Sequence, residues 1–135
     1  GGKKQPFQRP SKPREFRSSA GLPIFVGRSN RQNDRLTTRT AEKWDLWFHT
    51  QKIHGSHVIL STSGGRPDAQ SIAEAASLAA YFSQAQSSTK VPVDFTQVKF
   101  VKKPAAAKPG MVVYTNYQTI LADPNEELVK HLLVK

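Results

Sequence analysis

The stretch from Pro23 to Leu60, PIFVGRSNRQNDRLTTRTAEKWDLWFHTQKIHGSHVIL, decides the fold. The short apolar run Ile24–Val26 predicts a strand that ends at Gly27. Alternating residues at Trp44–His49 predict a second strand, and His57–Leu60 predicts a third. We therefore expect the order strand, basic helix, strand, strand.

Four arginines mark the helix between the first two strands. They are Arg28, Arg31, Arg35 and Arg39, spaced three, four and four residues apart. In a helix over Ser29–Ala41, capped by Ser29 or Asn30, they share one side. Their mutual repulsion, about 0.2–0.5 kcal/mol per adjacent pair, would be relieved by an anionic partner. A solvated surface helix is the alternative, and the stripe alone does not choose between the two.

The strand at 44–49 carries Asp45, Trp47 and His49 on one face and apolar residues on the other. A tryptophan ring can stack on an unpaired base, and core packing is the alternative for Trp47. His49 and His57 are either strand histidines held by hydrogen bonds or members of a ligand set. Zinc needs three or four convergent ligands, and catalysis needs a nucleophile motif that is missing here. We expect no metal, no cofactor and no enzymatic activity.

The charge of the chain is uneven. Residues 1–40 carry ten Lys/Arg against two Asp/Glu, a net charge of +8, whereas all 135 residues together carry +10. This asymmetry favours a polyanionic partner, most often a nucleic acid, although anionic membranes and heparin also attract basic proteins. The chain has no cysteine, which excludes disulfides and fits a reducing cytosol.

A chain of 135 residues suits one domain. Residues 1–13 predict a disordered basic linker that begins with an expression scar at Gly1-Gly2, and residues 14–135 predict the folded domain. No apolar run approaches the roughly 18 residues that cross a bilayer, and the N-terminus has no hydrophobic signal region. We expect a cytoplasmic, monomeric domain without a membrane partner.

The remainder of the chain is predicted to be scaffold. Ser71–Glu74 is a capping box, followed by an apolar stripe that predicts a helix over about Ile72–Gln86. Asp123 can cap a short last helix, with Pro124 at its first position.

Three strands are predicted between these helices. Val93–Lys102 forms a long strand whose change of phase suggests a bulge near Phe95. Met111–Tyr114 and Gln118–Leu121 predict a hairpin around Asn116. The fold class is therefore α+β, with a mixed, mostly antiparallel sheet of about five or six strands, two main helices and a short C-terminal helix.

Several motifs resemble the RNA-binding domain of the NFACT family. They are GRSNRQNDRLT (27–37), DLWFH (45–49), GSHVIL (55–60), AEAASLAAYFSQAQSSTKVPVDFTQVKFVKKP (73–104) and AKPGMVVYTNYQTILADPNEELV (107–129). The resemblance runs from about Arg14 to the C-terminus. Four residues depart from the usual pattern: Ala20, Ser29, His54 and Ala106, in place of an acidic residue, asparagine, proline and glycine. None of them removes the GR…QND or DxWxH core.

NFACT proteins are ribosome-associated quality-control factors, and many bacterial members are labelled fibronectin-binding proteins. The resemblance implies binding of tRNA and of 50S-type large-subunit rRNA, in support of C-terminal alanine tailing of stalled nascent chains. The ribosome makes those peptide bonds, so the chain contributes binding and not catalysis. The family label leaves a second hypothesis, an adhesion module for fibronectin or fibrinogen.

The candidate RNA-binding residues can donate to phosphates, pair with a base edge or 2′-hydroxyl, or stack on a base. They are Arg28, Asn30, Arg31, Gln32, Asn33, Arg35, Arg39, Trp47, His49, His57, Lys102 and Lys103. Local capping is the alternative for Asn30, Gln32 and Asn33. Lys102 and Lys103 open a basic loop that runs to Gly110.

Overall fold

The computed structural model describes residues 11–135, so most of the predicted linker lies outside the described residues. Six strands form the main sheet in the order β1-β2-β4-β3-β5-β8, and every neighbouring pair is antiparallel. These strands are β1 (Arg14–Arg17), β2 (Pro23–Val26), β3 (Leu46–Thr50), β4 (Val58–Leu60), β5 (Val91–Gln97) and β8 (Gln118–Ala122). A second, two-stranded sheet pairs β6 (Val101–Lys102) with β7 (Val113–Tyr114).

The helices are α1 (Asn30–Arg35), which continues as a π-helical turn over Leu36–Thr40, α2 (Ala69–Tyr81) and α3 (Glu126–Leu132). Ser29 caps α1 by accepting a hydrogen bond from the Gln32 N–H, as the sequence predicted. The predicted α+β class and the order strand, basic helix, strand, strand are both confirmed.

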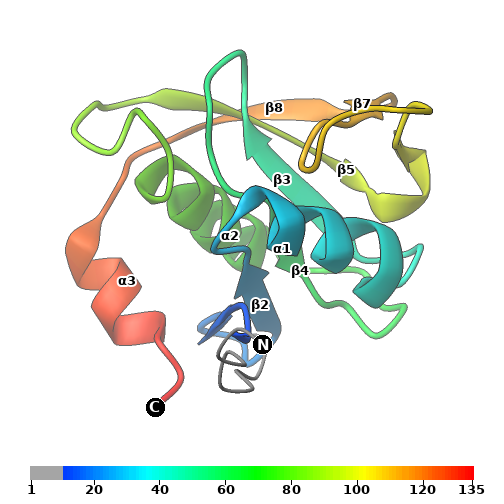
Figure 1. Ribbon diagram of the computed structural model, residues 1–135. Helices are drawn as coiled ribbons and strands as arrows, with labels where there is room; N and C mark the ends of the chain where they lie inside the picture. The colour runs from blue at the N-terminus through cyan, green and yellow to red at the C-terminus, as the bar shows by residue number, and fades with distance from the viewer. Residues whose placement is uncertain (1–10) are drawn as a thin grey trace, which may run out of the picture.

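Helices lie on both faces of the main sheet (Figure 1). The larger core fills the space between the sheet and α2 and includes Phe48, Leu60 and Leu78. Buried alanines on α2 let its backbone approach the strands closely. A smaller core on the opposite face joins Leu36 of the π-helical turn to Trp47. Neighbouring residues of β3 therefore face opposite cores, as the alternation of this strand predicted.

Two predicted helix caps are wrong. Asp68 caps α2 by accepting a hydrogen bond from the Ser71 N–H at 3.0 Å, so the helix begins before the predicted capping box. Asn125 caps α3, whereas Asp123 accepts a hydrogen bond from the Lys90 N–H at 2.8 Å. In both cases a second Asp or Asn stood within one turn of the predicted cap, and either residue type can accept such a bond.

The predicted hairpin and the predicted bulge are also wrong. β8 pairs with β5, and β7 pairs with β6 in the other sheet. Phe95 stays in register between Phe48 and Gln118. The change of phase comes instead from a 3₁₀ turn at Val98–Phe100, which leads the chain out of the main sheet. Asn116, with φ of 55°, reverses the chain between β7 and β8.

The C-terminal residues close one edge of the main sheet. Leu133 forms a β-bridge with Phe16, and the Val134 N–H donates to the Glu15 carbonyl at 3.0 Å. These contacts protect part of the β1 edge from pairing with another chain. Within residues 11–135, no helix is both long enough and apolar enough to span a membrane.

Candidate nucleic-acid interface

Two amide side chains of α1 bind separate segments of the chain. The Gln32 Oε1 accepts a hydrogen bond from the Arg28 N–H at 2.6 Å, and its Nε2 donates to the Ser11 carbonyl at 2.7 Å. The Asn33 Oδ1 accepts from the His57 N–H at 3.1 Å. Both amide side chains are buried and have hydrogen-bond partners inside the protein, so they hold the fold together, and a contact of either one with RNA stays a prediction.

Gly27 leaves the space that Asn33 requires. A Cβ atom at position 27 would overlap the Asn33 Oδ1, and the Gly27 N–H donates to the His57 carbonyl at 3.1 Å. Any larger side chain here would displace the amide that positions β4. The GR…QND pattern is therefore explained by packing and internal hydrogen bonds around α1.

Asp34 holds the basic loop 103–111 against α1. Its Oδ1 lies 2.9 Å from the Lys103 Nζ and accepts a hydrogen bond from the Gly110 N–H at 3.1 Å. Burial alone would raise the pKa of Asp34, but the Lys103 ammonium and the Gly110 N–H outweigh it and hold the pKa below its usual value. Lys103 thus has an internal partner, whereas Lys102 is exposed.

His57 joins the same loop to the π-helical turn. Its Nε2 donates to the Gly110 carbonyl at 3.0 Å, which leaves Nδ1 to accept from the Thr37 hydroxyl at 2.8 Å. Burial, with a smaller contribution from nearby His49, lowers the pKa of His57 to about 4, so the ring is neutral at pH 7. With 1% of its surface exposed and both ring nitrogens hydrogen-bonded inside the protein, His57 has a structural role, and a contact with RNA stays a prediction.

Trp47 is part of the smaller core. It is 1% exposed, its ring centroid lies 4.6 Å from that of Tyr114, and its plane is nearly parallel to the His49 ring. These neighbours cover the ring, so stacking of an RNA base on Trp47 stays a prediction. Trp44, just before β3, is 47% exposed and is the tryptophan that solvent reaches.

Arg31, Arg35 and Arg39, here called the arginine strip, lie together on the exposed side of α1 and the π-helical turn. They line one shallow hollow of about 230 Å³ with Pro109 of the basic loop. Within residues 11–135 the ion pairs are Lys103–Asp34 and Lys130–Glu126, so none of the three arginines forms an ion pair. The Asp34 carboxylate also lines this hollow, where it is paired with Lys103. This shared surface agrees with the spacing of the three arginines.

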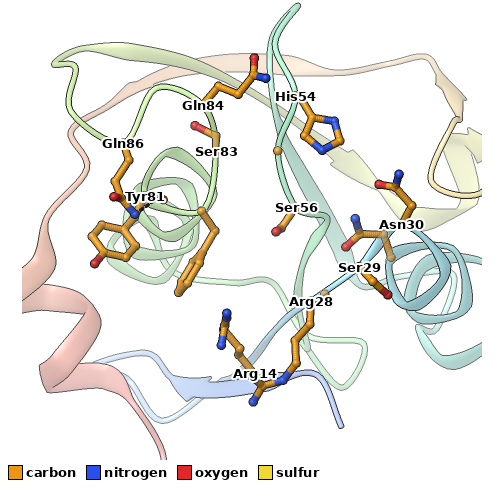
Figure 2. A pocket seen from close by; sticks show the side chains of 14 residues that line it. Arg14, Arg28, Ser29, Asn30, His54, Ser56, Tyr81, Ser83, Gln84 and Gln86 are labelled. Carbon is orange, nitrogen blue, oxygen red and sulfur yellow. Dashed lines mark hydrogen bonds between the residues drawn. The ribbon is translucent and has the colours of Figure 1, made fainter. Parts of the chain in front are cut away.

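Arg28 does not belong to the strip. It precedes the N-cap of α1, and its Nε donates to the Lys12 carbonyl at 2.8 Å. The prediction that four arginines share a helical face is therefore correct for three of them. Arg28 instead lines a separate hollow of about 310 Å³ together with Asn30 (Figure 2).

That hollow contains residues that sequence reasoning did not select. Arg14, His54, Tyr81 and Gln84 surround it in Figure 2, from β1, the β3–β4 turn and the end of α2. They come from three segments that are far apart in the sequence, so only the fold brings them together. His49 lies nearby, and its Nδ1 donates to the Thr50 carbonyl at 2.7 Å. No three His, Asp or Glu side chains among residues 11–135 are placed to hold a metal ion.

Comparison with known proteins gives a consistent family assignment. The model of the NFACT protein RNA binding domain matches residues 12–116. The "Rqc2 homolog RqcH" of Bacillus subtilis (strain 168) is 48% identical over 129 residues, 94% of this chain and 22% of that protein. The protein of the same name from Streptococcus pneumoniae serotype 2 is 41% identical over 127 residues, 93% of this chain and 23% of the relative.

A solved structure has the same fold. The C-terminal part of the fibronectin/fibrinogen-binding protein from Streptococcus suis superposes with a TM-score of 0.91 at 37% identity. The match covers 96% of this chain and 52% of that chain. The chain thus spans less than a quarter of the curated relatives named above. Because the family model matches most of its residues, the chain belongs to the NFACT protein RNA binding domain family.

Proposed function

We propose that this domain binds tRNA and large-subunit rRNA through the arginine strip, as the RNA-binding module of a cytoplasmic ribosome quality-control factor. The observation that carries the proposal is the strip itself, three exposed arginines on one helical surface that form no ion pair with any residue in the described range 11–135. Family membership supports RNA as the partner, and the names of the relatives support quality control as the process.

The strip suits a phosphate backbone for geometric reasons. From Arg31 to Arg39 there are eight residue steps, at most about 12 Å at the 1.5 Å rise of an α-helix, because the π-helical turn that holds Arg39 rises less per residue. That length spans roughly three nucleotides of a stacked strand at 3.4 Å each. Each guanidinium donates two parallel hydrogen bonds to a phosphate, which a lysine ammonium does not. The helix fixes the spacing of the three Cα atoms, while the exposed arginine side chains become ordered only on binding.

Reversal of two strip charges tests the proposal. Arg31→Glu with Arg35→Glu should weaken binding of tRNA and of rRNA fragments at least about tenfold, or about 1.4 kcal/mol. The melting temperature should barely change, because exposed substitutions usually alter stability by no more than about 0.5 kcal/mol. Affinity is measured by fluorescence anisotropy and stability by thermal melting.

The matched control is Lys130→Glu with Lys135→Glu, which makes the same charge change at and beyond α3, where both residues are exposed. Equal losses in the two double variants would mean that RNA senses only net charge. Unfolding of the arginine variant would make the strip structural and defeat the proposal.

Support of alanine tailing is the further step of this proposal. In it the domain holds RNA while the ribosome forms the peptide bonds, so the domain itself performs no catalysis. The arginine-strip substitutions, placed in a full-length protein that contains this domain, should reduce alanine tails on stalled nascent chains.

The name of the Streptococcus suis protein supports adhesion as the second candidate. Tight binding to immobilised fibronectin, without affinity for RNA, would favour that candidate.

A further inference from the structure

Three hollows adjoin one another on the domain and share lining residues. The hollow of Figure 2 shares Asn30 and His54 with a neighbour of about 200 Å³. That neighbour in turn shares His54 and Met111 with a third hollow of about 420 Å³. Because His54 lines all three, we call the whole feature the His54 groove. It begins at Arg14 on β1 and ends at Lys52 in the β3–β4 turn.

The lining of the His54 groove carries positive charge only. Arg14 and Arg28 lie at one end, Lys108 lines the middle, and Lys52 lines the other end. No Asp or Glu is among the residues that line the three hollows in the described part of the chain. Since a ligand with repeated negative charges would meet a cation at each stage, the groove favours an extended polyanion.

Between the cations the groove offers groups that recognise bases. Asn30 and Gln84 present exposed amides, each with donors and an acceptor. Figure 2 shows Asn30 and His54 on one side of the first hollow, opposite Tyr81. Met111, 58% exposed, adds a flexible apolar surface farther along. Aromatic, amide and thioether side chains of this kind contact the faces and edges of unpaired bases.

The Lys52 end holds a donor without a partner. Trp47 lines this part of the groove, and its buried indole N–H has no acceptor among residues 11–135. Tryptophan N–H groups usually find an acceptor when they are buried. Because the indole nitrogen is itself buried, an oxygen acceptor such as a base carbonyl would satisfy it only after a neighbouring side chain moves aside.

We infer that the His54 groove binds a single-stranded segment of RNA and contacts its bases. A duplex presents phosphates but keeps its base faces stacked inside, so it would leave the amide and aromatic groups unused. This inference rests on the proposed function and deepens it, because it names the form of RNA and a second surface.

The basic loop connects the groove with the arginine strip. Pro109 lines both the middle hollow and the hollow of the strip. Asp34 and His57 fix this loop through Gly110, so it forms a firm wall of the groove. A strand that leaves the groove over Pro109 reaches the strip directly, and one RNA molecule can therefore use both surfaces.

The test compares an unstructured 12-nucleotide RNA with a blunt duplex of the same length. Single-strand binding should be tighter by about tenfold, since each stacked base contributes about 1–3 kcal/mol. The double variant His54→Glu with Gln84→Glu should lose about tenfold or more for the single strand and little for the duplex. The matched control is His131→Glu with Gln70→Glu, two exposed positions on α3 and α2, with losses within about twofold.

Photocrosslinking tests separately which residues of the protein contact the RNA. A single strand that carries 4-thiouridine should crosslink to peptides containing His54 or Tyr81. The inference is overturned if crosslinks lie elsewhere, or if the groove variant loses no more affinity than its control. It is also overturned if a polyglutamate peptide displaces the RNA equally well, because charge alone would then explain binding. Loss of affinity only in the arginine-strip variant leaves the proposed function standing, whereas absence of all RNA binding defeats both.

Discussion

At the scale of single residues, several polar side chains of the family motifs hold the fold together. Asp45 accepts hydrogen bonds from the Glu42 N–H at 2.9 Å and the Thr62 N–H at 3.0 Å, which fixes the turn before β3 and the loop after β4. Asp94 on β5 accepts from the Tyr114 hydroxyl at 2.6 Å and so joins the two sheets. Both carboxylates are buried with partners, so they contribute order rather than ligand contacts.

His57 predicts a loss of stability in mild acid. Its pKa is about 4 in the folded protein, below the usual 6.5, mainly because of burial. Above pH 6.5 the ring is neutral in both states; between pH 6.5 and 4 only the unfolded chain takes up the proton. The free energy of unfolding should therefore decrease as the pH is lowered, by about 2–3 kcal/mol from pH 7 to pH 4.5. Urea unfolding at these two pH values measures the change.

The variant His57→Gln isolates this contribution. It should be less stable than the parent at pH 7, because it loses the ring that links Thr37 to Gly110, and its pH dependence should be flatter. Burial also lowers the pKa of His49 and adds a change of the same sign, so His49→Gln serves as the comparison. An identical pH profile in His57→Gln would show that this ring is not the source.

At the scale of elements, periodic segments could be predicted from the sequence and partner choice could not. The alternation in β3 and the arginine spacing in α1 are local patterns, and both appear in the fold. β7 has two residues, too few for any periodicity, and its pairing with β6 depends on the 3₁₀ turn that carries β6 out of the main sheet. A strand partner is a property of the assembled fold.

The candidate site shows the same contrast between residues that local spacing predicts and residues whose surroundings depend on the fold. Arg31, Arg35 and Arg39 were predicted because spacing alone places charges on one side of a helix. Gln32 and Trp47 were assigned to RNA because their residue types suit it, but residue type does not tell whether a partner lies inside the protein. The residues that meet around His54 come from distant segments and could not be grouped without the fold.

The contact between the basic loop and α1 yields a prediction about local order. Asp34→Ala removes the acceptor of the Gly110 N–H and the partner of Lys103. We expect faster hydrogen exchange of the Gly110 amide and a stability loss of about 1–2 kcal/mol. Hydrogen exchange by NMR measures the first and urea unfolding the second.

Asp123→Ala is the control for this variant, because it removes a carboxylate that also accepts a backbone N–H, that of Lys90, far from the loop. Gly110 exchange should stay unchanged in the control. Equal exchange rates in both variants would mean that Asp34 does not hold the loop.

At the scale of the whole molecule, part of the acidic charge lies away from the arginine strip. Of the carboxylates, Asp45, Glu74 and Asp94 are buried with internal partners. Three exposed acidic residues gather at and before α3: Asp123, Glu126 and Glu127. α3 lies apart from α1 in Figure 1, so this acidic cluster is distant from the arginine strip. Asp34, which lines the hollow of the strip, is paired with Lys103.

This distribution predicts a steep dependence of RNA affinity on salt. Each phosphate that the protein neutralises releases condensed counterions, so the logarithm of the association constant should fall linearly with the logarithm of salt concentration. For a single strand the slope is about −0.7 per phosphate, and Arg31→Glu with Arg35→Glu should make it shallower by about 1.4 if each arginine holds one phosphate.

The Lys130→Glu, Lys135→Glu control should keep the parent slope, because α3 carries no part of either surface. Fluorescence anisotropy from about 50 to 300 mM salt covers the range in which such slopes are resolved. Tight binding with a flat salt response would contradict an electrostatic interface, and an unchanged slope in the arginine variant would move the phosphate contacts away from α1.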